Sequence, residues 1–229
     1  MVNVFNIIFK VKILLFGTYR SRENRWVAPL PFREYRQRLP NNREQAVSRF
    51  TSLQRVLKRK PHMQEQYFAF MGKLIQNGHA EVARPLKNAE ECWYLPTFGV
   101  YHPRKPNQIR LVFDSSAEHR GVSLNDVLLT GPDLNNTLIG VLLRFPDIQQ
   151  MFYCFEVSEE HRNYLRFLWH QDNDVTMKVI EYRMKVHVFG NSPSPAVAIY
   201  GMRRAIKWKG TSMLMTAWYP YLPTMRQST

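Results

Sequence analysis

The sequence predicts an α+β fold, and three observations carry that prediction. The chain has 229 residues, 45% of them hydrophobic and 13% aromatic, which is enough apolar material for one large domain or two small ones. Two segments before residue 78 place apolar residues at helical spacing. After Trp93 the pattern changes to short β-like runs separated by turn residues.

The first forty residues differ in composition from the rest of the chain. Residues 1–20 begin with an apolar run, Val4–Phe16, that an asparagine and two lysines interrupt. The run is too short and too charged to span a bilayer, and it makes a poor secretory signal. Residues 21–40 are rich in arginine, contain three prolines and show no period, so we expect a basic, extended linker.

Two consecutive helices are predicted next. The first covers residues 41–59, where Asn41 or Asn42 can cap its start, and the second follows Pro61 and stops at Asn77-Gly78. The apolar residues at helical spacing are Ala46, Val47, Phe50, Leu53 and Leu57 in the first helix and Tyr67, Phe70, Met71, Leu74 and Ile75 in the second.

The rest of the chain predicts strands with two further helices. A turn-rich segment, His102–Gln108, separates two β-like runs, and a polar connection, Ser158–Asn163, separates two aromatic-rich ones. The predicted strands are Tyr94–Tyr101, Ile109–Phe113, Phe152–Val157, Tyr164–Trp169 and Tyr182–Val188, and the predicted helices are Asn135–Phe145 and Ser192–Ile206.

The charge is strongly basic and unevenly placed. Lys and Arg number 32 against 18 Asp and Glu, a formal net charge of +14. Residues 1–60 hold 14 basic and 3 acidic residues, whereas residues 61–204 are neutral overall. Such a balance predicts a polyanionic partner, usually nucleic acid and less often an anionic membrane. Residues 21–60 supply +8 of the excess, and the two ends supply the remainder.

The two cysteines, Cys92 and Cys154, are too few for a disulfide framework or a zinc cluster. We therefore expect no disulfide partner and a reducing, intracellular setting, either cytoplasmic or nuclear.

Three segments carry residues that chemistry could use, and each also has a plain structural interpretation. Asp147 follows a proline and, taken alone, is typical of a turn or a helix cap. The segment Phe189–Pro195 contains Gly190, which allows close backbone approach, but it also fits a simple strand–turn–helix connection. Residues 105–110 form a basic turn leading into an apolar strand, which fits a solvated hairpin.

Taken together and in order, a series of short sequence motifs resembles the reverse transcriptase of BEL/Pao-type LTR retrotransposons. The resemblance extends from about Val27 to Ala205. The motifs are WYLP at residues 93–96, GVYHP at 99–103, IRLVFDSSA at 109–117, SLN at 123–125, GPDL at 131–134, YLRFLW at 164–169, YRM at 182–184, HVFG at 187–190 and SP at 194–195.

The resemblance implies a right-hand polymerase of the DNA/RNA polymerase superfamily, here the fingers and an incomplete palm within residues 41–205. It implies an RNA or DNA template-primer and a dNTP as partners, and Mg²⁺ as cofactor. Asp147 matches the first catalytic, metal-binding carboxylate, and Phe152 matches the bulky residue that excludes a ribose 2′-hydroxyl. Lys105 and Arg110 match residues that meet the triphosphate. The segment that positions template and nucleotide is matched by Phe189, Gly190, Ser194 and Pro195.

Two departures from the family predict that the chain is catalytically inactive. A strand that precedes the metal-binding aspartate is missing, because Phe145 is followed directly by Pro146 and Asp147. The Tyr-x-Asp-Asp hairpin is also missing, because no Asp or Glu follows Ala205. A metal site without its rigid support and its other carboxylates loses most of its rate.

The tail, residues 206–229, is predicted to be a frame-shifted form of that hairpin. Reading each codon's third base with the first two of the next, Trp208-Lys209 forces Glu, Met215-Thr216 forces Asp and Trp218-Tyr219 forces Val. With permitted codons at the other positions, Trp208 through Pro220 can spell E-R-N-F-Y-V-D-D-G-L-V-S in this second frame. The nucleotide sequence tests this hypothesis.

Three functions therefore stay open at this point. The first is an inactive fragment of an RNA-directed DNA polymerase from a retrotransposon polyprotein. The second is a non-catalytic, basic nucleic-acid-binding protein derived from such an element. A membrane-associated protein is the weakest, because Val4–Phe16 has no clear polar face, and we expect no membrane partner.

Overall fold

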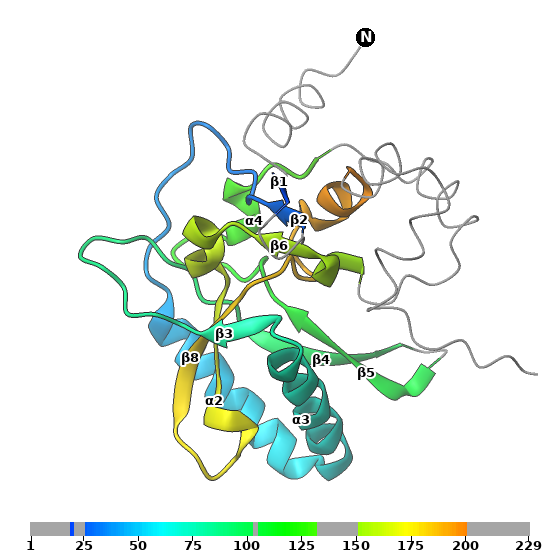
Figure 1. Cartoon of the computed structure of the whole chain (residues 1–229). Helices are drawn as coiled ribbons and strands as arrows, with labels where there is room; N and C mark the ends of the chain where they lie inside the picture. Colours follow the sequence, from blue (N-terminus) through cyan, green and yellow to red (C-terminus); the bar gives the residue numbers. More distant parts are fainter. Residues whose placement is uncertain (1–18, 21–25, 103–104, 132–150, 201–229) are drawn as a thin grey trace, which may run out of the picture.

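Figure 1 shows the computed structural model, which describes residues 19–20, 26–102, 105–131 and 151–200. Helices and strands are mixed, and the sheets are small. The elements are β1 Tyr19–Arg20, β2 Trp26–Ala28, α2 Arg43–Arg59, α3 Pro61–Gln76, β3 Ala80–Val82, β4 Thr97–His102, β5 Lys105–Phe113, α4 Leu124–Val127, η1 Met151–Cys154, β6 Phe155–Val157, η2 Glu159–Leu165, β7 Arg166–His170, η3 Gln171–Asn173 and β8 Val179–Met184. Residues 194–200 are also helical.

Helices α2 and α3 form a pair that covers the strands at one end of the molecule (Figure 1). Their apolar positions fall on one face, so α2 packs against β4 and β7 while α3 packs against β5 and β3. Pro61 starts α3 at the position where its missing N–H is not needed. The buried residues are Ala46, Phe50, Leu53 and Leu57 in α2 and Tyr67, Met71 and Leu74 in α3.

The strands form three small sheets. In the first, β1 pairs antiparallel with β2, and β2 pairs parallel with β6, so that Trp26 lies opposite Phe155. In the second, the order is β3-β8-β7 and both pairings are antiparallel. The third is the antiparallel β4–β5 hairpin, in which Thr97 lies opposite Phe113.

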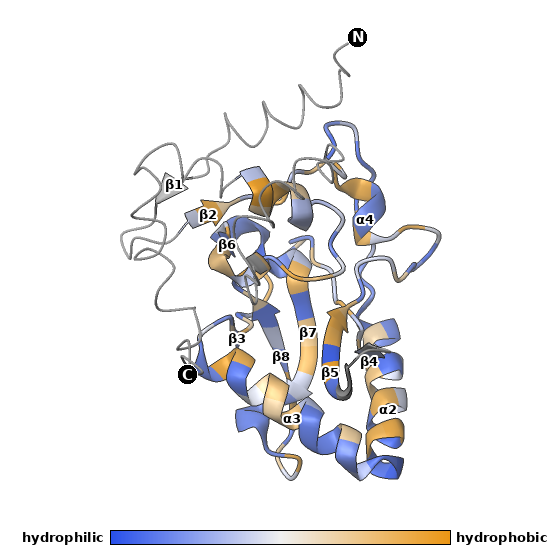
Figure 2. Cartoon of the chain, turned by 90° about the vertical axis from the view of Figure 1, so that its right-hand side faces the viewer, coloured by the Kyte–Doolittle hydropathy of each residue, from blue (hydrophilic) through white to orange (hydrophobic). Residues whose placement is uncertain are grey.

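The main hydrophobic core lies between the helix pair and the strands. Trp169 on β7 is almost fully buried and stacks on Tyr67 of α3, with their ring centroids 5.2 Å apart. Figure 2 shows β7 as mostly hydrophobic and α2 as alternating between hydrophobic and hydrophilic turns, as expected for a buried strand beside an amphipathic helix. A second, smaller core joins Ala28 and Leu129 to Ala196 and Val197 in the helical residues 194–200.

The two predicted helices and the predicted hairpin are present. Strand β5 begins at Lys105, so the turn is shorter than the predicted segment His102–Gln108. The prediction of a strand over Phe152–Val157 is correct only for its last three residues, because β6 can pair only along the three residues of β2. Phe152 itself lies in the 3₁₀ helix η1.

Residues 26–40, the described part of the predicted linker 21–40, contribute to the core. Val27, Leu30 and Leu39 are all buried, and β2 lies within this segment. The predicted helix Asn135–Phe145 and residues 206–229 lie outside the described residues. The structure describes the predicted helix Ser192–Ile206 at residues 194–200.

Neither cysteine forms a disulfide within the described part of the chain; Cys92 is buried and Cys154 is half-buried. Across the described ranges, none of the helices has the length and apolar character that crossing a membrane requires.

Two neighbouring carboxylates, Glu90 and Glu91, are each held by an arginine. Arg36 makes two hydrogen bonds to Glu91, of 2.7 and 2.8 Å, and the Leu39 backbone N–H also donates to it. Burial alone would raise the pKa of Glu91, but these hydrogen bonds and the Arg36 charge outweigh it and lower the pKa. The hydrogen bond from Arg84 holds the pKa of Glu90 at about 2.

Because these carboxylates have a lower pKa in the folded chain than in the unfolded one, we expect stability to fall at acid pH. Their contribution is complete above the unfolded value of roughly 4.3 and is lost as the pH falls through their lowered folded pKa values, which for Glu90 is about 2. Thermal unfolding between pH 7 and pH 3 measures the effect. Glu91→Gln should flatten the profile, and the exposed Glu118→Gln should follow the wild type. An unchanged profile in Glu91→Gln would contradict the assignment.

Candidate functional site

Three segments far apart in the sequence meet around Gly190. The Gly190 backbone has a φ of +111°, a conformation that residues with a side chain rarely adopt. A Cβ built at Gly190 would lie 2.3 Å from the Phe113 carbonyl oxygen and 3.4 Å from Cγ1 of Val112. Glycine is therefore required for the turn after residue 189 to lie against the end of β5. We call residues 189–192 the Gly190 turn.

Asn125 holds the Gly190 turn in place. Its Nδ2 donates to the Gly190 carbonyl at 3.1 Å and to Ser116 Oγ at 3.0 Å, while its Oδ1 accepts from the Ser192 backbone N–H at 2.9 Å. Sequence reasoning gave Asn125 no role. The available signal was the capping box of the short helix α4, in which Ser123 and Asp126 cap each other's backbone N–H and fix the residue between them.

Two aromatic rings lie beside this turn. Phe152 from η1 and Phe189 have ring centroids 6.2 Å apart and planes inclined by 41°. Phe152 is half-buried, whereas Phe189 is 54% exposed. An exposed aromatic ring supported by a second one is a surface on which another flat group can stack.

One face of the β4–β5 hairpin continues this surface. Ile109, Leu111 and Phe113 point into the core, so the alternate residues of the hairpin face outward. The outward face carries Phe98, Val100, Arg110 and Val112, with Phe98 opposite Val112 and Val100 opposite Arg110. Phe98 is 41% exposed, and Arg110 is also exposed. We call these four residues the hairpin face.

The hairpin face and the Gly190 turn are contiguous, because the side chain of Val112, like the backbone of Phe113, lies against Gly190. Together they present apolar and aromatic groups with one cation, Arg110. This combination is typical of surfaces that bind single-stranded nucleic acid, where rings stack on bases and cations meet phosphates. Figure 1 shows the hairpin lying along one side of the molecule.

Several buried polar atoms at this turn have no hydrogen-bond partner among the described residues. Both amide atoms of Asn191 are unpaired although the residue is only 2% exposed. The hydroxyls of Ser115, Ser192 and Ser194 are likewise unpaired in the described part of the chain. Buried polar groups normally find a partner, so these atoms are exceptions among the described residues.

His187 lies just before the turn and is almost fully buried. Burial lowers its pKa to about 4, so the ring is neutral at physiological pH. Its Nε2 lies 3.1 Å from the carbonyl oxygen of Ala28 in β2. His187 therefore links the strand β2 to the segment that leads into the turn.

The structure brings together most of the predicted nucleotide-binding residues. Phe152, Phe189 and Gly190 are adjacent, and Ser194 is buried at the start of the helical residues 194–200. Pro195 is exposed on that helix, and Arg110 lies on the hairpin face. Lys105 begins β5, but its side chain lies outside the description.

The predicted metal ligand Asp147 lies outside the described residues. Among the residues that the structure does describe, no three His, Cys, Asp or Glu side chains are grouped so that they could hold a metal ion. The described residues therefore do not supply a ligand set for Mg²⁺.

No family model matches the chain, and no curated protein matches it. The geometry around Gly190 and the hairpin face are therefore the structural features from which a function can be inferred.

Proposed function

We propose that this chain is a reverse-transcriptase-type fragment, fingers with an incomplete palm, that binds single-stranded nucleic acid and nucleotide but does not polymerise. One observation carries the proposal. The hairpin, Phe152 and the Gly190 turn come from three separate parts of the chain, and they meet at one surface. The sequence resemblance assigned nucleotide or template contact to each of them independently.

The chemistry of this surface fits the proposed ligand. Phe98 and Phe189 are exposed rings on which bases can stack. Arg110 places a guanidinium on the same face, where it can pair with a phosphate. The half-buried Phe152 lies beside Phe189 and adds a second ring to this surface.

The proposed lack of polymerase activity is based on the carboxylates that the chain does not supply. Two-metal polymerase chemistry needs several carboxylates held at one place. The sequence after Ala205 contains no Asp or Glu, and the described residues contain no such cluster. We therefore expect the full chain to give no Mg²⁺-dependent product in a primer-extension assay, and clear synthesis would contradict this part of the proposal.

A second candidate, nucleic-acid binding through the basic N-terminal part, is favoured by the surface of α2. Arg49, Arg55, Lys58 and Arg59 are all exposed, and the structure gives none of them an ion-pair partner among its described residues. Deleting residues 1–60 is not a clean test, because α2 supplies four buried core residues. Neutral substitutions on its outer face are the suitable alternative.

Binding of a fluorescein-labelled single-stranded RNA of about twenty nucleotides, followed by fluorescence anisotropy, tests both candidates. We expect Phe189→Ala and Arg110→Gln each to weaken binding about tenfold, the loss that removing one stacked ring or one charge-assisted contact produces. The matched controls are Tyr35→Ala, which removes a ring that is 94% exposed elsewhere, and the exposed Arg33→Gln. Both controls should bind like the wild type.

The fourfold variant of Arg49, Arg55, Lys58 and Arg59 to glutamine separates the two candidates. If it abolishes binding while Phe189→Ala and Arg110→Gln do not change it, the second candidate replaces the first. Thermal unfolding of every variant ensures that altered affinity is not altered folding.

A further inference from the structure

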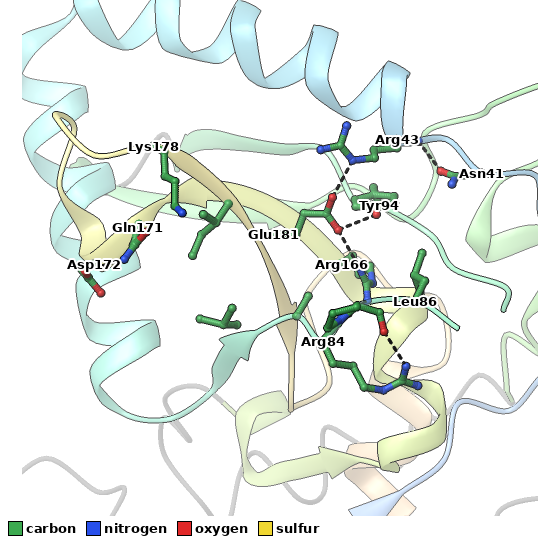
Figure 3. Close-up of a pocket in the computed structure, with 14 residues that line it drawn as sticks. Asn41, Arg43, Arg84, Leu86, Tyr94, Arg166, Gln171, Asp172, Lys178 and Glu181 are labelled. Carbon is green, nitrogen blue, oxygen red and sulfur yellow. Dashed lines mark hydrogen bonds and ion pairs between the residues drawn. The ribbon is translucent and has the colours of Figure 1, made fainter. Parts of the chain in front are cut away.

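A pocket of about 650 Å³ lies apart from the candidate site and shares no residue with it (Figure 3). It is formed by the start of α2, the end of β3 with the segment after it, and the first half of β8. Its volume falls within the range of pockets that hold small organic ligands. Val82, Leu86 and Ile180 supply apolar lining.

A set of hydrogen bonds fixes one wall of this pocket around Glu181. Oε2 of Glu181 accepts from Arg166 at 2.6 Å and from the Tyr94 hydroxyl at 2.7 Å, and Oε1 accepts from Nε of Arg43 at 2.7 Å. The side chain of Asn42 holds the backbone of Tyr94 through two hydrogen bonds of 2.8 Å, which anchors the start of α2. The wall is therefore preorganised rather than assembled by a ligand.

Hydrogen bonds already occupy both carboxylate oxygens of Glu181, whereas two cationic side chains of the pocket still have groups without a carboxylate partner among the described residues. Arg43 uses only its Nε in that ion pair, and its two terminal nitrogens have no carboxylate partner among the described residues. The Lys178 ammonium likewise has no carboxylate partner in the described ranges. In Figure 3 these two side chains lie on either side of Glu181. The other acid in the lining, Asp172, accepts a hydrogen bond from Gln171 at 3.3 Å.

The backbone adds to this positive character. Arg43 is the first residue of α2, a helix of 17 residues, so the positive end of the helix dipole lies at the pocket. A planar guanidinium whose terminal nitrogens are not held by a carboxylate, a lysine ammonium and a helix N-terminus are together complementary in charge to a phosphate group. The apolar lining can accommodate the organic part of such a ligand.

We infer that this pocket binds the phosphate of a nucleotide-sized ligand, with Arg43 and Lys178 as the cationic groups that contact it. The inference does not depend on the function proposed for the hairpin face. Two sources could supply the phosphate, a free nucleotide or the end of a nucleic-acid strand, and the experiment separates them.

Calorimetric titration of the full chain with ATP is the first arm. We expect one saturable site, weakened about tenfold by Lys178→Met and several-fold by Arg43→Lys, because each removes a charge-assisted contact. Arg43→Lys retains a cation beside Glu181, so the wall is conserved. The matched control is Lys87→Met, an exposed lysine outside the lining, which should leave ATP affinity within about twofold of wild type.

The second arm repeats the comparison with a 5′-phosphorylated single-stranded DNA of about twelve nucleotides and its unphosphorylated form. If Lys178→Met weakens the affinity for the phosphorylated strand alone, the strand end is the source of the phosphate and the inference stands. If Lys178→Met changes neither the affinity for ATP nor that for the phosphorylated strand, the inference is overturned. If ATP affinity responds to Phe189→Ala and not to Lys178→Met, ATP binds at the Gly190 turn, which overturns this inference and leaves the proposed function intact.

Discussion

Replacing Gly190 with alanine is expected to lower the free energy of unfolding by about 3 kcal/mol or more. The added Cβ would lie 2.3 Å from the Phe113 carbonyl oxygen, and this backbone atom belongs to a fully buried residue. The backbone φ of +111° would strain any residue that has a Cβ, even if there were room for that atom. Neither the strand end nor the turn can move, because Asn125 ties the turn to the segment after β5. Chemical denaturation monitored by tryptophan fluorescence measures the loss.

The matched control is Gly78→Ala. Gly78 also has a positive φ, of +67°, but no atom lies within 4 Å of the position a Cβ would take. Its expected cost is that of the backbone conformation alone, about 1–2 kcal/mol. If Gly190→Ala is no more destabilising than Gly78→Ala, the close approach between the turn and β5 is wrong. The proposed nucleic-acid surface would then lose its geometric basis as well.

Replacing Arg166 with methionine is expected to destabilise the chain by about 3–5 kcal/mol, because it leaves carboxylate and amide groups without their buried partner. Arg166 is only 2% exposed, and it pairs with Glu181 at 2.6 Å. It also donates to Asn163 and to the Arg84 carbonyl. Methionine retains much of the length of the side chain, so the main loss is electrostatic rather than a cavity.

Arg43→Gln provides the comparison, because Arg43 pairs with the same carboxylate from a half-exposed position. Its side chain is 53% exposed, so losing this ion pair should cost under about 1 kcal/mol. Equal effects of the two substitutions would show that burial does not distinguish them, which would contradict the role given to Arg166. Thermal and denaturant unfolding at pH 7 measure both.

The parts of the fold that sequence predicts are those that local patterns determine. In α2 and α3, apolar residues recur at three and four positions, and Pro61 marks the boundary, so both helices could be placed within about two residues. The hairpin was also predictable, because two alternating runs flank a turn. Its polymerase-type assignment stays a prediction, since it depends on the resemblance and not on periodicity.

Features that depend on distant partners could not be predicted in this way. Strand β2 has only three residues, and its pairing with β6 gives no local signal. Asn125 looks like any polar residue in a loop until the Gly190 turn is placed against it. The pairing of Arg166 with Glu181 depends on the register of β7 and β8, because these residues lie on adjacent strands. The resemblance singled out Phe152 and Phe189, and the tertiary structure places them side by side.

The parallel pairing of β2 with β6 also determines the order in which the chain can fold during synthesis. The backbone N–H of Leu30, two residues after β2, donates to His161, which is 131 positions further along the chain. While the ribosome makes the intervening residues, Trp26, Val27 and Leu30 emerge without the strand that later buries them. The local helix pair can form early, and the N-terminal strand docks last among these elements. Nascent chains that end before Phe155 would therefore expose this apolar segment, which makes them targets for chaperones and proteases.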